Sequence, residues 1–190
     1  EGITVRITPN ADYGVTISTV NLEGTAAGVL DLGAMSLGVS TWTVRPATVT
    51  IVGSVSKNGA NGGQELSLKA DIFTANGWVL DSTPVTDGAG LVDELSMFVL
   101  FSATTMSEAP TGTDFGNATA NAGLTDEGWS HAGGTGPGTR FEKQGAHNTD
   151  MDQMSVNDAK HMWMYFRLPP TTSTGADQEL TLTLTAGANL

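Results

Sequence analysis

A short acidic stretch near residue 150 carries the residue types best suited to a chemical task in this chain. Asn148, Asp150 and Asp152 place three oxygen-bearing side chains at alternate positions. Carboxylate and amide oxygens are the ligands that Ca²⁺ prefers, but Gln153 stands where an EF-hand loop has its glycine and Ala159 where it has its glutamate. The stretch is therefore not an EF-hand, and two interpretations stay open: a calcium site in a loop or at a subunit contact, and a solvated acidic loop.

Residue patterns typical of catalysis do not occur. His131, His147 and His161 lack the spacing of a zinc-binding helix, and the glycine-rich stretch 133–138 lacks the Gly-Lys-Ser/Thr ending of a phosphate-binding loop. There is no Gly-x-Ser-x-Gly motif. Because the chain has no cysteine, thiolate catalysis and Cys-type zinc sites are excluded. We therefore predict that the protein is not an enzyme, and we expect His161 to form a structural hydrogen bond.

Tryptophan and acidic residues are the residue types that carbohydrate-binding and carbohydrate-hydrolysing proteins use. A glycosidase needs two carboxylates held about 5–10 Å apart, and nothing in the sequence pairs them. Trp129 lies in a long polar segment and could act as a stacking platform for a sugar, whereas Trp42, Trp78 and Trp163 lie in strand-like contexts and are expected in the core. Glycans are therefore candidate ligands of a binding module and not substrates.

Charge and composition narrow the classes of partner. The 190 residues include 20 acidic and only 8 basic side chains, which gives a formal charge of -12. No basic stripe exists to neutralise nucleic-acid phosphates, and anionic membranes would repel such a chain. Few charges and 24 glycines are typical of exported surface proteins, and a removed signal peptide or a trimmed expression product would both explain a start at Glu1. We expect an extracellular or cell-surface location, without membrane insertion because no run reaches the ~18 apolar residues of a spanning helix.

The hydrophobic pattern is that of β-strands. Residues 65–72 and 180–185 alternate apolar and polar side chains, as a strand with one buried face requires. Residues 96–103 and 161–168 are almost continuously apolar, which predicts strands covered on both faces. We expect 161–168 to pair with 180–185 as a closing hairpin.

A second hairpin is expected earlier in the chain. Residues 48–55 and 65–72 are joined by a turn rich in glycine and asparagine at 57–63. Between the first strands and this unit, Trp42 and Val44 alternate with polar residues, and we expect both to point inward.

The two least regular parts of the chain are its start and a long insertion. Ile3, Val5 and Ile7 alternate with polar residues, so residues 1–8 form either an edge strand of their own sheet or a strand donated to a neighbouring subunit. Residues 104–160 are loop-rich, and a loop this long tends to be functional or to pack against a partner. We expect subunit contacts at Ile3, Val5 and Ile7 in the first strand and at three aromatic residues of the insertion, Phe115, Trp129 and Phe141.

At class level the chain resembles exported immunoglobulin-like β-sandwich proteins of microbial surfaces and extracellular fibres. The pieces that carry the resemblance are Leu30-Asp31-Leu32-Gly33 with Ser36-Leu37-Gly38, the strand-turn-strand of 48–72, and the two runs that begin at Trp163 and Leu180. The resemblance implies a non-catalytic building role, often with an N-terminal strand donated between neighbours.

These observations predict one all-β domain, an immunoglobulin-like or jelly-roll sandwich of about eight to ten strands. The predicted function is that of a structural subunit that self-assembles with copies of itself into an extracellular filament, tube or surface layer. A secreted carbohydrate-binding module is the alternative. No cofactor is predicted apart from the calcium considered above.

Overall fold

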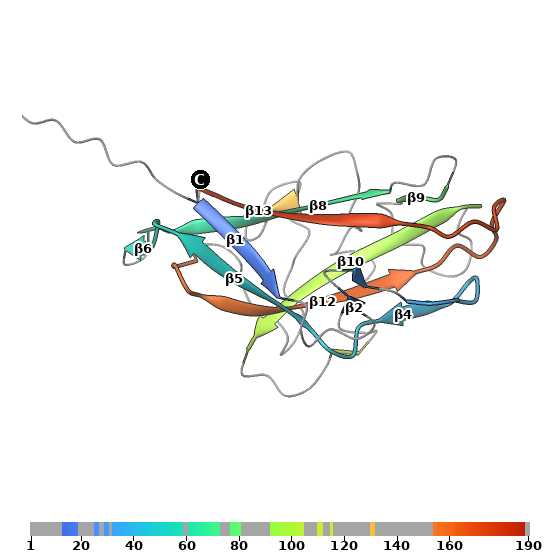
Figure 1. Cartoon of the computed structure of the whole chain (residues 1–190), viewed down its shortest axis with the longest axis horizontal. Helices are drawn as coiled ribbons and strands as arrows, with labels where there is room; N and C mark the ends of the chain where they lie inside the picture. Colours follow the sequence, from blue (N-terminus) through green and yellow to red (C-terminus); the bar gives the residue numbers. More distant parts are fainter. Residues whose placement is uncertain are drawn as a thin grey trace, which may run out of the picture.

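Two β-sheets pack face to face, so the predicted all-β sandwich is confirmed (Figure 1). The structure is a computed structural model. It describes residues 13–18, 25–26, 29–30, 32–58, 61–72, 77–80, 92–104, 110–111, 115, 130–131 and 154–188. No helix occurs in these ranges.

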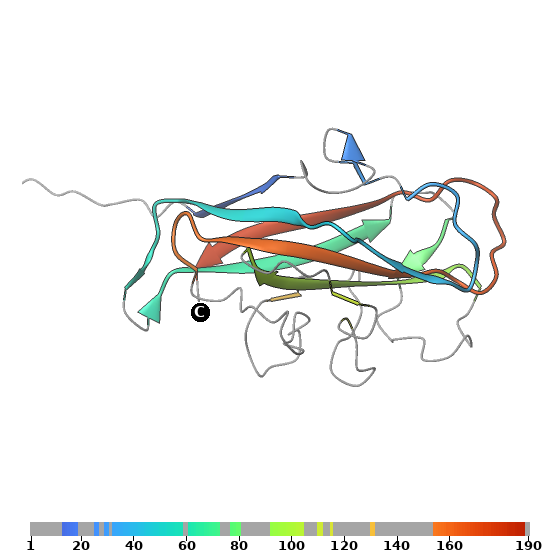
Figure 2. The same ribbon diagram turned by 90° about the horizontal axis from the view of Figure 1, so that it is seen from below.

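The larger sheet has six strands. Its order is β1-β5-β12-β10-β9, and β4 pairs with β12 beside this path. All pairings are antiparallel except that of β9 with β10. Figure 2 shows β5, β12 and β10 side by side, with β1 along the outer edge. The strands are β1 (Tyr13–Ser18), β4 (Ser40–Trp42), β5 (Ala47–Gly53), β9 (Val79–Leu80), β10 (Glu94–Ala103) and β12 (Ala159–Arg167).

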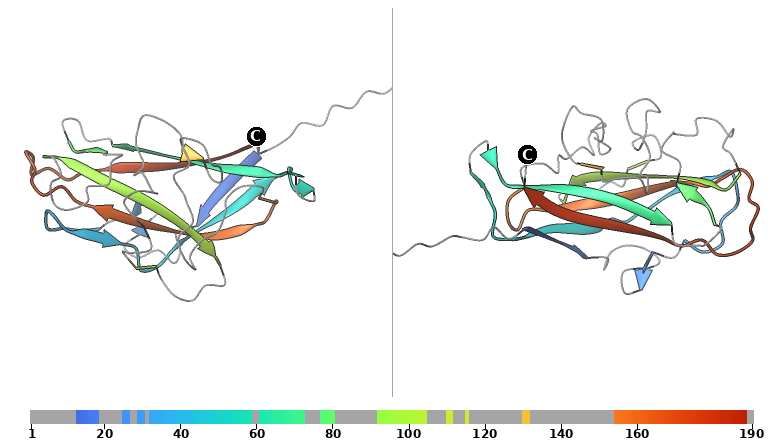
Figure 3. Two further views of the ribbon diagram at one scale, coloured as in Figure 1. Left: turned by 180° about the vertical axis from the view of Figure 1, so that it is seen from behind. Right: turned by 90° about the horizontal axis from the view of Figure 1, so that it is seen from above.

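The smaller sheet has three strands in the order β11-β8-β13, and its two long strands lie in front in the right-hand view of Figure 3. Two short hairpins, β2-β3 and β6-β7, stand apart from both sheets. The bounds are β8 (Gln64–Ile72), β11 (Ser130–His131), β13 (Leu180–Ala188), β2 (Thr25–Ala26), β3 (Val29–Leu30), β6 (Lys57–Asn58) and β7 (Asn61–Gly62).

The core lies between the sheets and follows the period of two. Alternate residues of each long strand point inward, since successive side chains of a strand point to opposite faces; those of β5, β8, β10 and β12 are buried and those of β13 are partly buried. Three methionines of the core, which adapt well to irregular spaces, line the inner side of β12 and the turn before it. The buried inward-facing residues are Ala47, Val49, Ile51, Leu66, Leu68, Ala70, Leu95, Met97, Val99, Phe101, Met154, Met162, Met164, Phe166 and Leu168.

Both predicted hairpins are wrong in their pairing. β5 pairs with β1 and β12, whereas β8 pairs with β11 and β13, so the two strands of the unit at 48–72 lie in different sheets. The same holds for β12 and β13. Each connection is an arch that crosses from one sheet to the other. An arch and a hairpin share the same alternation of side chains, because both bury one face of each strand.

The Gln64 side chain fixes the first of these crossings. Gln64 is completely buried, and its Nε2 donates hydrogen bonds to the carbonyl oxygens of Val52 (2.9 Å) and Val55 (2.8 Å). Its Oε1 accepts a hydrogen bond from the backbone N–H of Gly14 at 3.1 Å. One amide therefore joins the end of β5, the turn after it and the start of β1 to the first residue of β8.

Asp93 fixes the opposite end of the sandwich. Its backbone has a φ of 66°, in the left-handed region, immediately before β10. Its carboxylate accepts hydrogen bonds from the Thr172 hydroxyl (2.6 Å), the Ser173 backbone N–H (2.8 Å) and the Ser173 hydroxyl. Thr172 in turn accepts a hydrogen bond from Trp78 Nε1 at 2.9 Å. The crossing from β12 to β13 is thereby tied to the segment that leads into β9.

Replacing Gln64 by leucine tests the first crossing. Leucine keeps most of the volume but leaves partly buried backbone groups of Gly14, Val52 and Val55 without the Gln64 amide as their partner. We expect the free energy of unfolding to fall by about 1–3 kcal/mol, measured by urea denaturation. Gln178→Leu is the matched control, because Gln178 is less buried, and its amide accepts a hydrogen bond from the Trp78 backbone N–H and donates an exposed one to the nearby Ala176 carbonyl. An unchanged midpoint for Gln64→Leu would contradict the role given to this amide.

The Asp93 network predicts a pH dependence of stability. Hydrogen bonds from the Ser173 side chain, the Thr172 hydroxyl and the Ser173 backbone hold the pKa of the Asp93 carboxyl below its ordinary value. The stabilisation is therefore present above the unfolded pKa of about 3.9 and is lost as the pH falls through the lower folded pKa. Asp93→Asn tolerates the left-handed backbone but cannot ionise. We expect it to lower the urea midpoint at about pH 7 and to approach the wild type near pH 2. A difference that stays constant with pH would rule out ionisation as the cause.

Candidate functional site

The outer face of the six-stranded sheet carries a second apolar cluster. Phe98 and Leu100 of β10 and Trp163 of β12 are buried there together with Phe115 of the insertion. The Trp163 indole N–H donates to the hydroxyl of buried Ser102 at 2.9 Å, so its polar atom is satisfied. β10 and β12 are thus covered on both faces, as the apolar runs at 96–103 and 161–168 predict.

Tyr165 is the centre of an aromatic stack on this face. Its ring lies nearly parallel to those of Trp42 (centroids 6.2 Å apart) and Phe115 (5.4 Å), and it meets Phe98 edge to face at 5.8 Å. Such geometries are favourable beyond the area that they bury. The stack connects a described residue of the insertion to the sheet edge formed by β4.

Trp42 and Val44 do not point into the core, which corrects the prediction for both. Trp42 is 37% exposed and Val44 60% exposed. The buried residue of this segment is Thr43, whose backbone N–H donates to the Met164 carbonyl at 2.9 Å and whose hydroxyl accepts from the Met164 N–H at 3.0 Å. The segment is the outermost strand beside β12, so no further described strand covers Trp42 and Val44.

Sequence reasoning missed this exposed edge, although a signal for it exists. The strand is only three residues long and lies between Gly38, with a φ of 69°, and Pro46. Short strands bounded by such residues are typical of sheet edges. Leu37 and Val39, which precede the strand, are also exposed.

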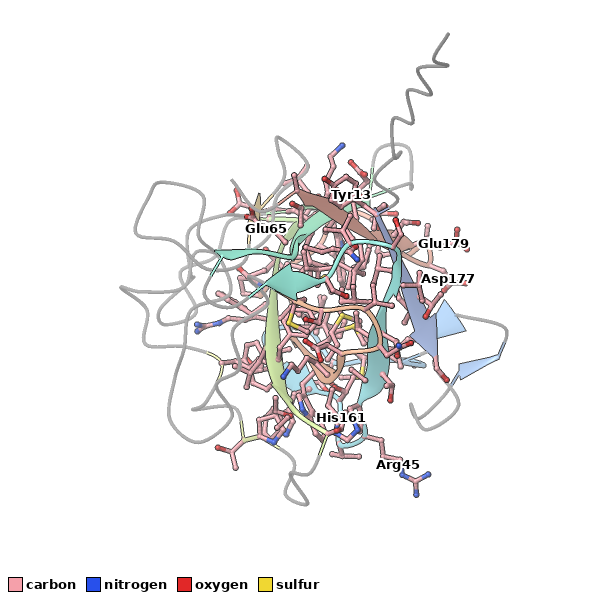
Figure 4. The ribbon with its side chains drawn as sticks, turned by 90° about the vertical axis from the view of Figure 1, so that its left-hand side faces the viewer. Tyr13, Arg45, Glu65, His161, Asp177 and Glu179 are labelled. Carbon is pink, nitrogen blue, oxygen red and sulfur yellow. The ribbon has the colours of Figure 1, made fainter. Side chains whose placement is uncertain are left out.

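β1 and β13 are also edge strands, β1 of the larger sheet and β13 of the smaller one. Among the described strands, β1 pairs only with β5, and β13 pairs only with β8. In Figure 4, Tyr13 lies where β1 and β13 come together, while Arg45 points away from the core. Tyr13 and Ile17 on β1 are 37% and 43% exposed although they share a face with core residues of β5.

His161 lies on β12 at the margin of the outer cluster. Its ring meets Trp163 edge to face at 6.2 Å, and burial lowers its pKa. The expected structural hydrogen bond is not found at Nδ1, which is buried and lacks a partner among the described residues. The described neighbours across the ladder, Ser102 and Thr48, offer neither a carboxylate nor a cation to the ring.

Most of the predicted site residues lie outside the described residues. These are the candidate calcium ligands Asn148, Asp150 and Asp152 and the candidate contacts Ile3, Val5, Ile7, Trp129 and Phe141. Within the described ranges, no three acidic or histidine side chains gather into a group that could hold a metal ion.

Phe115 is the one predicted contact residue that the structure describes, and it is only 2% exposed. Its ring packs on Tyr165 of the same chain, so it contributes to the internal packing, and its role as a subunit contact stays a prediction. We expect Phe115→Ala to lower the free energy of unfolding by about 3–5 kcal/mol, because it removes a buried aromatic ring. The measurement is urea denaturation of the isolated chain.

Trp42→Ala is the control for this variant. Trp42 stacks on the same tyrosine from the exposed side, so its loss should cost less than about 1.5 kcal/mol. If Phe115→Ala left stability unchanged and altered only assembly, Phe115 would be a subunit contact after all.

Comparison with known proteins does not assign the chain to a family. The sequence matches no protein-family model, and no curated protein matches it. In the described part of the chain, no helix is long and apolar enough to cross a membrane.

Proposed function

We propose that this protein is a non-catalytic structural subunit that assembles with copies of itself into an extracellular filament, tube or surface layer. The observation that carries the proposal is the unprotected state of one long sheet edge, that of β13. Soluble β-proteins usually guard an edge with lysine, proline, a bulge or a very short strand, because unpaired backbone groups invite another strand.

β13 shows this most clearly. Its nine residues, Leu-Thr-Leu-Thr-Leu-Thr-Ala-Gly-Ala, include no charged residue and no proline. Its side away from β8 has no partner strand among the described residues. Segments with high β-propensity and low charge associate readily with other strands. In a monomer such an edge leaves backbone groups unpaired and prone to unspecific association. In an assembly the same groups can pair with a strand of another copy.

The negative net charge of the chain is compatible with assembly that occurs only at specific contacts. A formal charge of -12 keeps free subunits apart at long range and still allows close contact where edges are uncharged. Calcium bound by Asn148, Asp150 and Asp152 would reduce this repulsion locally. Export, with loss of a signal peptide, belongs to the same proposal, as does the likeness to immunoglobulin-like surface proteins.

A secreted carbohydrate-binding module remains the second candidate, because one aromatic ring is presented as sugar-binding platforms require. Trp42 is exposed and is held in place by stacking on Tyr165. The platform predicted from the sequence, Trp129, lies outside the described residues. A glycan array with the wild type, Trp42→Ala and Trp129→Ala separates the two classes. Saccharide binding that either variant abolishes would favour the module, whereas a structural subunit gives no such signal.

Removal of residues 1–8 tests assembly directly. We expect the shortened chain to remain a folded monomer with an unchanged far-UV circular dichroism spectrum and to form no filaments in negative-stain electron microscopy. The reason is that the donated-strand form of the proposal needs the apolar alternation at positions 3, 5 and 7.

The matched controls keep the full length. Ile3, Val5 and Ile7 are replaced together by serine in one variant, and Thr4 and Thr8 by serine in the other. Only the first should abolish assembly. Unchanged assembly without residues 1–8 would refute the donated strand, and a wild-type chain that stays monomeric with and without calcium would refute the subunit role.

A further inference from the structure

Two neighbouring rows of side chains cross the outer face of the six-stranded sheet, from β4 over β12 to β10. One row is aromatic, and the other, two residues further along each strand, is polar and carries one cation. Side chains two positions apart on a strand share a face, so both rows lie on the same surface. The aromatic row consists of Trp42, Tyr165 and Phe98, and the polar row of Ser40, Arg167 and Ser96.

Ser96 is buried in the polar row without a hydrogen-bond partner. It is only 1% exposed, and its Oγ has no partner among the described residues. Ser102, on the same strand and face, is equally buried, but its hydroxyl accepts a hydrogen bond from Trp163 Nε1 at 2.9 Å. A buried hydroxyl that stays unpaired costs free energy, so it calls for an explanation. Ser96 therefore has an unused hydrogen-bond donor directly opposite Arg167.

Arg167 is the one cation of the two rows. It is partly buried, and within the described ranges it forms no ion pair. Glu94, two positions before Ser96 on β10, is diagonal to it and does not contact it as a salt bridge. A guanidinium presents a planar fork of N–H groups that matches a carboxylate bidentately. The polar row thus offers a carboxylate one cation and, from Ser96 and exposed Ser40, two hydroxyl donors.

We propose that the two rows bind an acidic sugar residue, with its pyranose ring on Trp42 and its carboxylate at Arg167 and Ser96. Trp42 is exposed and is held in place by stacking on Tyr165, so it presents an aromatic face to the apolar side of a sugar ring. Trp42 and Arg167 are diagonal neighbours across the ladder, about 7–8 Å apart, a spacing that one sugar unit and its carboxylate bridge. The inference rests on the carbohydrate-binding candidate given above and specifies its ligand class, a glycan that contains uronic acid.

The charge of the chain favours this ligand over a denser polyanion. Nucleic acid requires many cations for its closely spaced phosphates, and a chain with a formal charge of -12 repels it. At physiological ionic strength, exposed charges more than about 8 Å apart are largely screened. A single carboxylate in contact with Arg167 is therefore governed by that cation more than by the net charge. One arginine matches a ligand whose carboxylates are separated by neutral atoms.

Isothermal titration calorimetry with trigalacturonate and its methyl ester tests the role of charge. The two trisaccharides differ only in whether their carboxylates are free. We expect the acid to bind at least about tenfold more tightly, because esterification removes the charge-assisted hydrogen bonds. Arg167→Gln should reduce the affinity for the acid to that for the ester. Arg45→Gln, which changes an exposed arginine that points away from the core (Figure 4), should bind as the wild type does.

Ser96→Ala and Ser102→Ala form a matched pair that separates binding from stability. Ser96→Ala removes a hydroxyl without a described partner, so we expect an unchanged or higher urea midpoint and an affinity for trigalacturonate about tenfold weaker. Ser102→Ala leaves the Trp163 N–H without its acceptor, so we expect a lower midpoint and an unchanged affinity. A purely structural role of Ser96 would leave the affinity unchanged.

The outcomes distinguish this inference from the function on which it rests. Equal affinity for the acid and the ester would overturn the inference, while the carbohydrate-binding candidate would stand. Binding of the acid that Arg167→Gln or Ser96→Ala leaves unchanged would also overturn it, because the carboxylate is then bound elsewhere. If neither trisaccharide binds, the inference fails, and a glycan array without any signal then removes the carbohydrate-binding candidate as well.

Discussion

A buried amide determines where this chain passes from one sheet to the other. Gln64 begins β8, and its side chain satisfies backbone groups at the end of β5, in the following turn and in β1. Buried backbone polar groups must find partners, and here a single side chain supplies them at the point where the ladder of β5 ends. The crossing places β5 and β8 in different sheets, and the hydrogen bonds of Gln64 stabilise it.

The strands themselves are readily predicted from the sequence, because alternation and apolar runs report how many faces of a strand are buried. β8, β10, β12 and β13 all lie where the pattern predicts them. Their partners are not predictable in the same way. The residues that point inward in an arch are the same ones that point inward in a hairpin, and only the long-range contacts of Gln64 and Asp93 distinguish the two.

The local sequence pattern also does not show whether an individual side chain is buried or exposed. Trp42 and Val44 alternate with polar residues as core residues do, yet both are exposed, because Trp42 lies on the outer face opposite Tyr165 and the buried residue between them is Thr43. Phe115 shows the converse, since an aromatic residue in an irregular segment is held against Tyr165. Whether a side chain is covered depends on neighbours that are distant in sequence. The exposure of Trp42, Val44 and Phe115 could therefore not be predicted from the local sequence.

The outer faces of the two sheets offer little surface suited to association with another copy, so the strand edges are the better candidates. The outer face of the six-stranded sheet is already occupied by the cluster around Trp163. On the outer face of the smaller sheet, β13 presents exposed threonines beside an ion pair of Lys69 and Asp71 at 2.8 Å on β8. Such a polar surface gains little from being buried against another copy. The uncharged backbone edge of β13 and the exposed apolar side chains of β1 gain both hydrogen bonds and apolar contacts when a strand is added. A strand added to an edge extends a sheet in one direction, so this distribution of polar and apolar surface agrees with the proposed linear assembly better than with a stack of faces.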